Sequence, residues 1–585
     1  MLEYSSTCIN SSTMIEEKER IRLHTKLYPY TRTTLQTELK IERKGPDYLS
    51  YAVGDLIGMD SERYSDLDNQ TRAYIRICET LCGAYAKSGD FTRLAKALVL
   101  RYESKAIQHL VENYPLATLS GIRFGTDTMI DQNGDFKTVE VNLGPVGGPP
   151  EAIKAQTFFN SESFPVSSSD YVTHFIHSLD SFYKKACDAM TVDPKPLKER
   201  QLVIVENDEW TPGNFIWLDL LREKGVNVEI APREALVYDE KTNKLNLETG
   251  SDKKSVDQVI LYFHLQDDIK NNSEEEPGDI VISLINNGTI VESSPFPLIV
   301  LASKSIAGLI SQMANDSDGM LAQRLVINRE DLEAVRDMFP KTYHWRRSFF
   351  KQMEEDGFSR TDLLDYLKSK NLILKSARTN LFAGMGVFGS DNKEGRMGYD
   401  DFFQSLKEEV YKRLVREGIG NYFSFFLWDD FVTSMIENGS IDNPTQFRQI
   451  LHILKNGSDP EIESLKNVIP EINIESFRKV VKFLHQPKFA NTENAGTFFR
   501  ELAMTLNING DTNKLTDKIL SYISTFMLLP FVLQEKINPS ESTELRVSGF
   551  VGENPNDIAS MISILKRPER EGDLKSVHII VPKAK

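Results

Sequence analysis

The spacing of apolar residues changes along the chain and predicts helices and strands in mixed order. After a polar leader, apolar residues recur every three or four positions from Asp60 to Tyr114, which is typical of amphipathic helices, and Ala152 to Met190 also reads as helix. Beyond this point the pattern changes to short apolar runs of strand length. Helices and strands that alternate in this way predict a protein of the α/β or α+β class.

A βαβ unit is predicted in the next part of the chain. Its elements, in chain order, are the strand Leu202–Val205, the helix Asn214–Lys224, the strand Val226–Ile230 and the strand Val259–Phe263. Strands joined through a helix run parallel, so we expect a parallel sheet. The first turn, Glu206 to Glu209, is acidic and lacks the GxGxxG pattern of a phosphate-binding loop. This lobe is therefore not expected to hold a nucleotide.

A β-hairpin is predicted between Arg123 and Asn142. The pair Asn133-Gly134 favours a two-residue type I′ turn, because both residues tolerate the positive φ that this turn requires. With that turn, Asp127 lies directly opposite Glu140 and Gly125 lies opposite Asn142. Side chains two residues apart on a strand share a face, so Glu140 and Asn142 point the same way.

The hairpin is a candidate magnesium site. Two carboxylates facing each other on one sheet face repel unless a cation lies between them, and Asn142 adds a neutral oxygen. Oxygen ligands of this kind suit Mg²⁺, which shares its shell with waters and nucleotide phosphates. The alternative is an ordinary hairpin with a polar, solvated face.

The run 143–150 (LGPVGGPP), which follows the hairpin, contains three glycines and three prolines. It predicts a tight loop whose backbone can approach a ligand closely.

A second cluster lies between Asn371 and Gly389. A strand ending in Lys375 leads to Arg378 and then to a glycine-rich loop that includes Gly384 and Gly386. Basic side chains beside exposed backbone amides suit nucleotide phosphates. The alternative interpretation is a mobile surface loop.

A third cluster lies near the end of the chain. The apolar strand Phe531–Leu533 is followed at once by the polar run Gln534-Glu535-Lys536 and by Ile537. Backbone groups against an apolar wall can hold an adenine ring, although the same pattern also fits an ordinary strand end. A further strand, Glu544–Phe550, places Arg546 on the face opposite to that of its neighbours.

In this order the clusters resemble the circularly permuted ATP-grasp ligases, the group that contains eukaryotic glutathione synthetase and glutathionylspermidine synthetase. In that group the metal-binding hairpin precedes the lysine strand, the glycine loop and the adenosine-binding segment. The matching motifs here are Asp127, Glu140-Val-Asn142, Lys304 in LASKS, Lys375 in LILK, the loop Gly384 to Gly389, and Gln534-Glu535-Lys536-Ile537. The resemblance covers most of residues 116–400 and 525–585, and it implies a Rossmann-like substrate-side lobe.

The resemblance implies an ATP- and Mg²⁺-dependent carboxylate–amine ligase that forms an amide through an acylphosphate. It assigns Mg²⁺ to Asp127, Glu140 and Asn142, the phosphates to Lys304 and Lys375, the closing loop to Gly384 and Gly386, and the adenosine to Gln534, Glu535, Lys536 and Ile537. Its partners are a small-molecule or peptide carboxylate and an amine. Phosphoryl transfer needs positioning and charge neutralisation rather than a protein nucleophile.

The chain departs from the family at the position two residues before the metal-binding aspartate. Relatives have an arginine there, whereas this chain has Gly125. Arg123 shares the strand face but lies roughly 7 Å further along at about 3.3 Å per residue. Arg378 and Arg546 are the other candidates for stabilising the transition state.

The expected organisation has six parts. They are an N-terminal helical region (1–115), the metal-binding hairpin with its helices (116–198), the substrate-side lobe (199–300), the nucleotide lobe with the glycine-rich loop (301–398), a large helical insertion (399–526), and the adenosine-binding segment with closing strands (527–585). The insertion reads as amphipathic helices separated by Asn, Gly, Asp and Pro breaks. It is interpreted as lid reinforcement or a homodimer surface, or as a wall that shapes the site for a larger amine.

Composition narrows the partners. The 585 residues include 69 basic and 85 acidic residues, for a net charge of −16, which argues against nucleic acid as the main partner. Four cysteines are too few for a disulfide framework, and Cys78 and Cys82 are expected in a core. We expect no signal peptide and no membrane segment, and hence a cytoplasmic protein. Two other functions remain open: a catalytically silent binding scaffold, and a kinase on the same fold whose acceptor is a hydroxyl.

Overall fold

A computed structural model describes much of the N-terminal half and the C-terminal strands. The described residues are 9–13, 52–87, 89–144, 150, 153, 168–206, 212–249, 252–269, 276–315, 319–344, 353, 355–358, 366, 369, 372–376, 453, 457–468, 531–537, 539–566 and 576–582. The chain divides into two compact units. Unit 1 comprises Met1–Asn315, Leu325–Pro340 and Ile537–Lys585, and unit 2 comprises Asp316–Arg324 and Lys341–Lys536.

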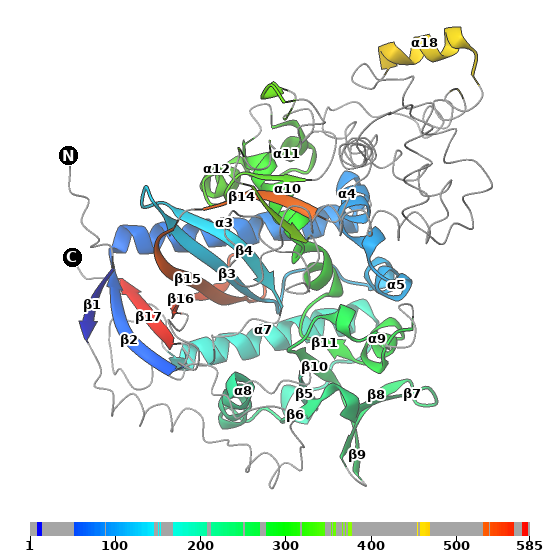
Figure 1. Cartoon of the computed structure of the whole chain (residues 1–585). Coiled ribbons are helices and arrows are strands. Elements are labelled where there is room, and N and C mark those ends of the chain that lie inside the picture. Colours follow the sequence, from blue (N-terminus) through cyan, green and yellow to red (C-terminus); the bar gives the residue numbers. More distant parts are fainter. Residues whose placement is uncertain are drawn as a thin grey trace, which may run out of the picture. The chain divides into compact units, whose positions relative to one another are not determined.

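Unit 1 contains a seven-stranded sheet in the order β1-β2-β17-β16-β15-β3-β4 (Figure 1). Its strands are β1 (Ile9–Thr13), β2 (Ala52–Met59), β3 (Arg123–Asp131), β4 (Phe136–Leu143), β15 (Pro539–Val551), β16 (Ile558–Lys566) and β17 (Ser576–Pro582). Neighbouring strands are antiparallel except β17 and β2, which are parallel. Strands β1 and β2 lie in the segment that the sequence predicted as a polar leader. Strand β1 pairs with β2, and β2 pairs with β17 from the other end of the chain, so local sequence patterns do not predict their place in the sheet.

Two long helices pack against this sheet. Helix α3 (Ser61–Ala86) begins at Asp60, whose side chain accepts hydrogen bonds from the backbone N–H groups of Glu62 and Arg63. It forms one core with the sheet, made by Met59, Tyr64, Leu67, Ile130, Phe136, Leu545, Val547 and Ile562. Helix α7 (Ser168–Ala189) packs through Tyr171 and Phe175 on Phe550 of β15, whereas Leu545 and Val547 of the same strand belong to the core with α3.

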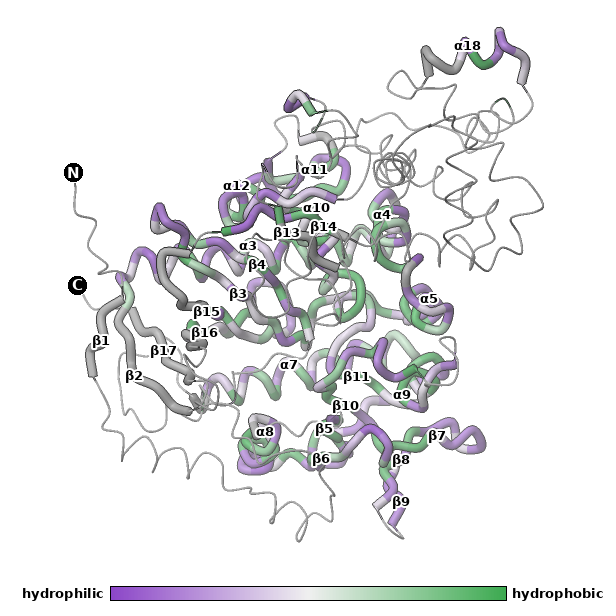
Figure 2. Tube along the Cα trace, in the orientation of Figure 1, coloured by the Kyte–Doolittle hydropathy of each residue, from purple (hydrophilic) through white to green (hydrophobic). Residues whose placement is uncertain are grey.

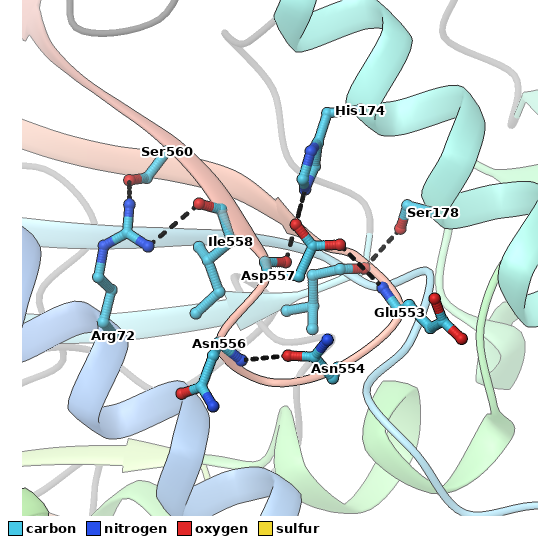
Figure 3. Close-up of polar contacts among 10 residues, drawn as sticks. Arg72, His174, Ser178, Glu553, Asn554, Asn556, Asp557, Ile558 and Ser560 are labelled. Carbon is cyan, nitrogen blue, oxygen red and sulfur yellow. Dashed lines mark hydrogen bonds and ion pairs between the residues drawn. The ribbon is translucent and has the colours of Figure 1, made fainter.

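Polar contacts hold the β15–β16 ribbon from both helices (Figure 3). Arg72 of α3 donates to the carbonyl of Ile558 and to the hydroxyl of Ser560, both at 3.1 Å. From α7, His174 lies 3.2 Å from the carboxylate of Asp557, and Ser178 donates to the carbonyl of Val551. These contacts fix the strand that carries Arg546.

The predicted βαβ unit is confirmed. The four-stranded sheet has the order β11-β10-β5-β6, with every neighbouring pair parallel. Its elements are β5 (Leu202–Glu206), α8 (Pro212–Glu223), β6 (Val228–Pro232), β10 (Gln258–Leu261) and β11 (Ile290–Val291). A separate antiparallel sheet contains β7 (Leu236–Asp239), β8 (Lys244–Thr249) and β9 (Asp252–Ser255). In Figure 2 strand β9 is hydrophilic, in contrast to the buried strand β5.

The remaining elements of unit 1 are shorter. They are α4 (Asp90–Leu98), α5 (Lys105–Asn113), α9 (Asp279–Ile285), α10 (Lys304–Asn315), α12 (Arg329–Val335), the 3₁₀ segments Leu100–Tyr102, Leu197–Glu199, Arg233–Ala235 and Leu265–Asp267, and a π-helical turn, Pro297–Leu301. Helices α3, α4 and α5 confirm the helical prediction for Asp60 to Tyr114, and Cys78 and Cys82 are buried in α3 as expected.

Unit 2 contains a three-stranded antiparallel sheet in the order β12-β14-β13. Its described elements are β12 (Thr342–His344), β13 (Leu372–Ser376), β14 (Phe531–Glu535), α11 (Met320–Arg324) and α18 (Asp459–Val468). Apart from α18, the predicted helical insertion lies outside the described residues almost entirely. Helices and several sheets make this a mixed α/β protein, in agreement with the predicted class. Within the described part of the chain, no helix is long and apolar enough to cross a membrane.

Candidate functional site

The hairpin turn differs from the predicted one. Asp131 and Asp135 flank a three-residue loop, because the N–H of Asp131 donates to the carbonyl of Asp135 at 2.9 Å and the N–H of Gly134 donates to the carbonyl of Asp131 at 3.0 Å. Of the pair Asn133-Gly134, only Gly134 has positive φ, at +87°. A type I′ turn needs positive φ at both positions, so the predicted two-residue turn is wrong, and the loop has the geometry of a type I turn closed by a glycine bulge.

The predicted pairing at the candidate site is nevertheless confirmed. Beside the turn the register is shifted by one residue, with Thr128 opposite Thr138, but a β-bulge at Val139 restores it. Asp127 is therefore the direct partner of Glu140, and Gly125 is the partner of Asn142. The sequence revealed neither the three-residue loop nor the bulge, and their effects on the strand register cancel each other.

Arg546 lies beside Asp127 on the next strand. The two residues are direct partners in the antiparallel pair β15–β3. The guanidinium contacts the carboxylate oxygen Oδ1 of Asp127 from Nε at 2.7 Å and from Nη2 at 2.5 Å. The Arg546 and Asp127 side chains are only 13% and 14% exposed, so the pair is shielded from most of the solvent. Of the two candidate arginines that the structure describes, Arg546 and not Arg123 thus contacts the predicted metal-binding aspartate.

Lys304 contacts the carboxylate on the other side. Its Nζ lies 3.0 Å from Oε1 of Glu140. Lys304 is the first residue of α10, which follows the buried π-helical turn Pro297–Leu301. That turn packs against the end of β4: a Cβ on Gly144, whose φ is +108°, would lie 2.7 Å from Cδ2 of Leu298. Close packing of the turn on Gly144 therefore helps to place Lys304 beside the hairpin.

The four charged groups form a row across three neighbouring strands and a helix. The row consists of Arg546, Asp127, Glu140 and Lys304, and its formal charges sum to zero. The repulsion expected between the two facing carboxylates is thus relieved by two basic side chains of the chain itself.

The oxygen atoms at the hairpin are of the type that binds Mg²⁺. Asp127, Glu140 and Asn142 offer oxygen ligands on one face of two adjacent strands, the hard donors that Mg²⁺ prefers. Among the described residues there is no group of three or more His, Cys, Asp or Glu side chains that could hold a metal ion. A metal here would consequently depend on Asn142 and on oxygens from water or a phosphate.

His264 lies near the row and was missed by the sequence analysis. Burial lowers the pKa of its imidazole below the ordinary value, and the positive charge of Lys304 lowers it further, whereas the negative charges of Asp267 and Glu140 act in the opposite direction. His264 follows β10 at the carboxyl edge of the parallel sheet, where ligands of such sheets bind. That position after a predicted strand was the available signal.

Arg123 is held elsewhere. Its Nε and Nη2 donate to the two carboxylate oxygens of Glu292 at 2.9 and 2.7 Å, and it also donates to the carbonyl of Leu261. Its guanidinium lies 4.2 Å from the centre of the Tyr262 ring. Both partners of the ion pair are almost fully buried, and burial raises the pKa of Glu292 even though Arg123 lowers it. These contacts connect β3 to the parallel sheet, so Arg123 has a structural role.

In unit 2, strand pairing brings together part of the predicted nucleotide site. Lys375 lies on β13 opposite Val532 of β14, and Gln534 and Glu535 end the same strand. The Gln534 side chain is buried and donates to the hydroxyl of Thr342 at 3.3 Å, and the N–H of Glu535 donates to the carbonyl of Lys341.

Lys536 and Ile537 are half-buried and follow β14, Ile537 being the first residue of the returning unit 1 segment. Arg378, Gly384 and Gly386 lie outside the described residues. The roles assigned to all these residues remain predictions.

No protein-family model matches the sequence, and no curated protein matches it. Among solved structures, the chain is similar to a glutathione synthetase-like effector from Globodera pallida in its apo form. The alignment has 10% sequence identity and covers 97% of this chain and 98% of the other, with a TM-score of 0.42, which is too low to establish a shared fold.

Proposed function

We propose that the chain is an ATP- and Mg²⁺-dependent carboxylate–amine ligase with a circularly permuted ATP-grasp fold. The observation that carries the proposal is the row of Arg546, Asp127, Glu140 and Lys304, with Asn142 on the same face. Carboxylate oxygens next to two basic side chains provide ligands for a divalent cation and partners for phosphate oxygens within one small area.

The proposal gives each group a task. Asp127, Glu140 and Asn142 would hold Mg²⁺, which would neutralise charge on the transferred phosphoryl group. Lys304 and Arg546 would bind and orient phosphate oxygens, and the partial burial of both supports this because shielded charges interact more strongly. The adenosine is assigned to Gln534–Ile537, with Lys375 on the neighbouring strand as a second phosphate-binding lysine.

The proposed reaction has two steps. A substrate carboxylate oxygen attacks the γ-phosphorus, the β,γ-anhydride bond breaks, and ADP leaves. An amine then attacks the carbonyl carbon of the acylphosphate, losing a proton, and inorganic phosphate leaves as the amide forms. No side chain has to form a covalent bond, which agrees with a site that offers charges rather than a nucleophile. Exclusion of water would protect the acylphosphate.

A binding scaffold without catalysis is the second candidate, and one observation favours it. Both carboxylates already have a basic partner within 3.0 Å, and Gly125 has no side chain where relatives have an arginine. A site whose charges satisfy one another can stabilise the fold without binding a nucleotide.

Release of ADP from ATP distinguishes the candidates. The full chain would be incubated with Mg²⁺, ATP and pools of small carboxylic acids, with and without pools of amines. A ligase releases ADP only when an acid is present and yields an amide only when an amine is added. ADP release with a hydroxyl acceptor and no amide product would indicate a kinase. Bound ATP that is never hydrolysed with any pool would contradict the ligase and favour the scaffold.

A further inference from the structure

The charges at the hairpin are balanced before any ligand arrives. Asp127 and Glu140 contribute two negative charges, and Arg546 and Lys304 contribute two positive ones, at 2.5 to 3.0 Å. The four side chains are between 13% and 26% exposed, so water screens them only in part. The carboxylates are therefore held by internal cations.

This arrangement opposes a free divalent cation. Nε and Nη2 of Arg546 contact Oδ1 of Asp127, and Nζ of Lys304 contacts Oε1 of Glu140. A metal ion that approached both carboxylates would meet two positive groups within a few ångströms, in a place where their repulsion is poorly screened. It would have to displace them or share their oxygens.

A polyphosphate changes the balance. Its oxygens offer the guanidinium and ammonium groups alternative partners, and charge-assisted hydrogen bonds of this type are strong. Once the two cations turn to phosphate, the carboxylates can bind a metal, whose charge in turn favours the phosphate. The metal and the anion then raise each other's affinity by the same factor.

We infer that Arg546 and Lys304 are internal counterions that keep Asp127 and Glu140 from binding a divalent cation until a polyphosphate binds beside them. This regulation rests on the proposed function of the same site. It assigns both residues an inhibitory effect on metal binding in addition to their proposed phosphate contacts, and the two effects have opposite signs.

The opposite signs make the inference testable with Mn²⁺, which prefers the same oxygen ligands as Mg²⁺ and has a paramagnetic signal. The full chain would be titrated with Mn²⁺ alone, without nucleotide, and free Mn²⁺ would be measured by electron paramagnetic resonance. The wild-type protein is expected to bind weakly. Lys304→Met and Arg546→Met are each expected to bind about 5- to 150-fold more tightly, the usual range of coupling between sites.

Two controls locate the effect. Lys254→Met removes a lysine that lies 2.7 Å from Glu229 elsewhere in unit 1, and it should bind Mn²⁺ as the wild type does. Adding Glu140→Gln to Lys304→Met should abolish the gain. Because Lys304 and Arg546 lie on different elements, each variant tests the inference independently, and urea unfolding would establish that each is folded.

The inference is overturned if either folded variant, Lys304→Met or Arg546→Met, binds Mn²⁺ alone no more tightly than the wild type does. Stabilisation of the wild type by Mg²⁺ and ATP, measured separately by thermal unfolding, tests the proposed function. A gain in Mn²⁺ affinity without any ATP effect would support inhibition of metal binding by Lys304 and Arg546, but it would contradict the relief of that inhibition by a polyphosphate and also the ligase. An ATP effect without the gain would support the proposed function and contradict the inhibition.

Discussion

Arg546 and Asp127 are direct partners on neighbouring strands although 419 residues separate them in the chain. The contact joins the predicted metal hairpin to the C-terminal ribbon and gives one carboxylate a cation before any ligand binds. The candidate site is thus assembled by the long-range pairing of β3 with β15, as well as by the hairpin itself.

The Arg546–Asp127 pair should show a clear coupling in stability. Arg546→Met and Asp127→Asn are each expected to lower the free energy of unfolding by about 1 to 3 kcal/mol, because each leaves a partly buried polar group without its partner. The double variant should lose about 0.5 to 3 kcal/mol less than the sum. Denaturant unfolding measures all three, and strict additivity would contradict the coupling.

The exposed pair Arg329–Glu333 on α12 supplies the control for this cycle. Its side chains are 90% and 49% exposed, although the N–O distance is 3.0 Å. Removing either charge should change the free energy of unfolding by no more than about 0.5 kcal/mol, because solvent screens the pair.

The Arg123–Glu292 pair should respond more strongly. Glu292→Gln leaves a buried guanidinium without its counterion and is expected to cost about 3 to 5 kcal/mol in the free energy of unfolding. The double variant Arg123→Met with Glu292→Leu replaces both charges by apolar groups and should be more stable than Glu292→Gln. Chemical denaturation tests this order. A double variant that is less stable than the single one would show that Arg123 stabilises the fold by something other than this ion pair.

Local patterns predicted the parallel sheet and the facing of Asp127 and Glu140. The strands of the βαβ unit are short apolar runs with a helix between them, so the nearby sequence is enough to predict the type and order of these elements. The facing pair was predicted for a partly wrong reason, because the three-residue loop and the bulge at Val139 offset each other. Whether a loop has two or three residues depends on backbone angles that Asn133-Gly134 permits in both forms.

The basic partners of Asp127 and Glu140 could not be predicted from the residues near them in the sequence. The sequence placed Arg546 on a strand face and Lys304 among phosphate-binding residues, but neither pairing follows from spacing along the chain. Arg123 was misleading because it shares the strand face of Asp127, whereas burial against Glu292 determines where its guanidinium lies. Contacts between segments distant in sequence decide such cases.

Asp268 should make stability depend on pH. Burial raises the pKa of its carboxyl from 3.8 to about 6, although the N–H of Val281 donates to it and lowers the pKa. The unfolded chain therefore loses this proton between about pH 4 and 6 while the folded chain keeps it, so stability falls across that range by about 3 kcal/mol. Asp268→Asn keeps the acceptor and should not show this fall. Urea unfolding at pH 4.5 and 7 compares the two, and identical pH profiles would contradict the buried proton.

Gly144 should tolerate no side chain. An alanine there would combine a positive φ of +108° with a Cβ only 2.7 Å from Leu298, and the π-helical turn that precedes Lys304 would have to move. Gly225→Ala is the matched control, since Gly225 also has positive φ, +78°, but has nothing within 4 Å of its Cβ position. The control should cost about 1 to 2 kcal/mol from backbone strain alone. Thermal unfolding should show a larger loss for Gly144→Ala, and equal losses would argue against close packing on Leu298.

The central claim, that the hairpin binds a nucleotide together with Mg²⁺, is tested most directly by thermal unfolding of the full chain with ATP, with and without Mg²⁺. Glu140→Ala would be compared with Glu229→Ala, which removes an equally exposed, ion-paired glutamate, 25% against 26% exposed, away from the hairpin.

At a hundredfold excess over its dissociation constant, a ligand stabilises the folded state by about 2.7 kcal/mol. We predict a Mg²⁺-dependent rise in the unfolding temperature of the wild type and of Glu229→Ala that is absent in Glu140→Ala. No shift in any of the three proteins, or the same shift in all of them, would contradict the claim.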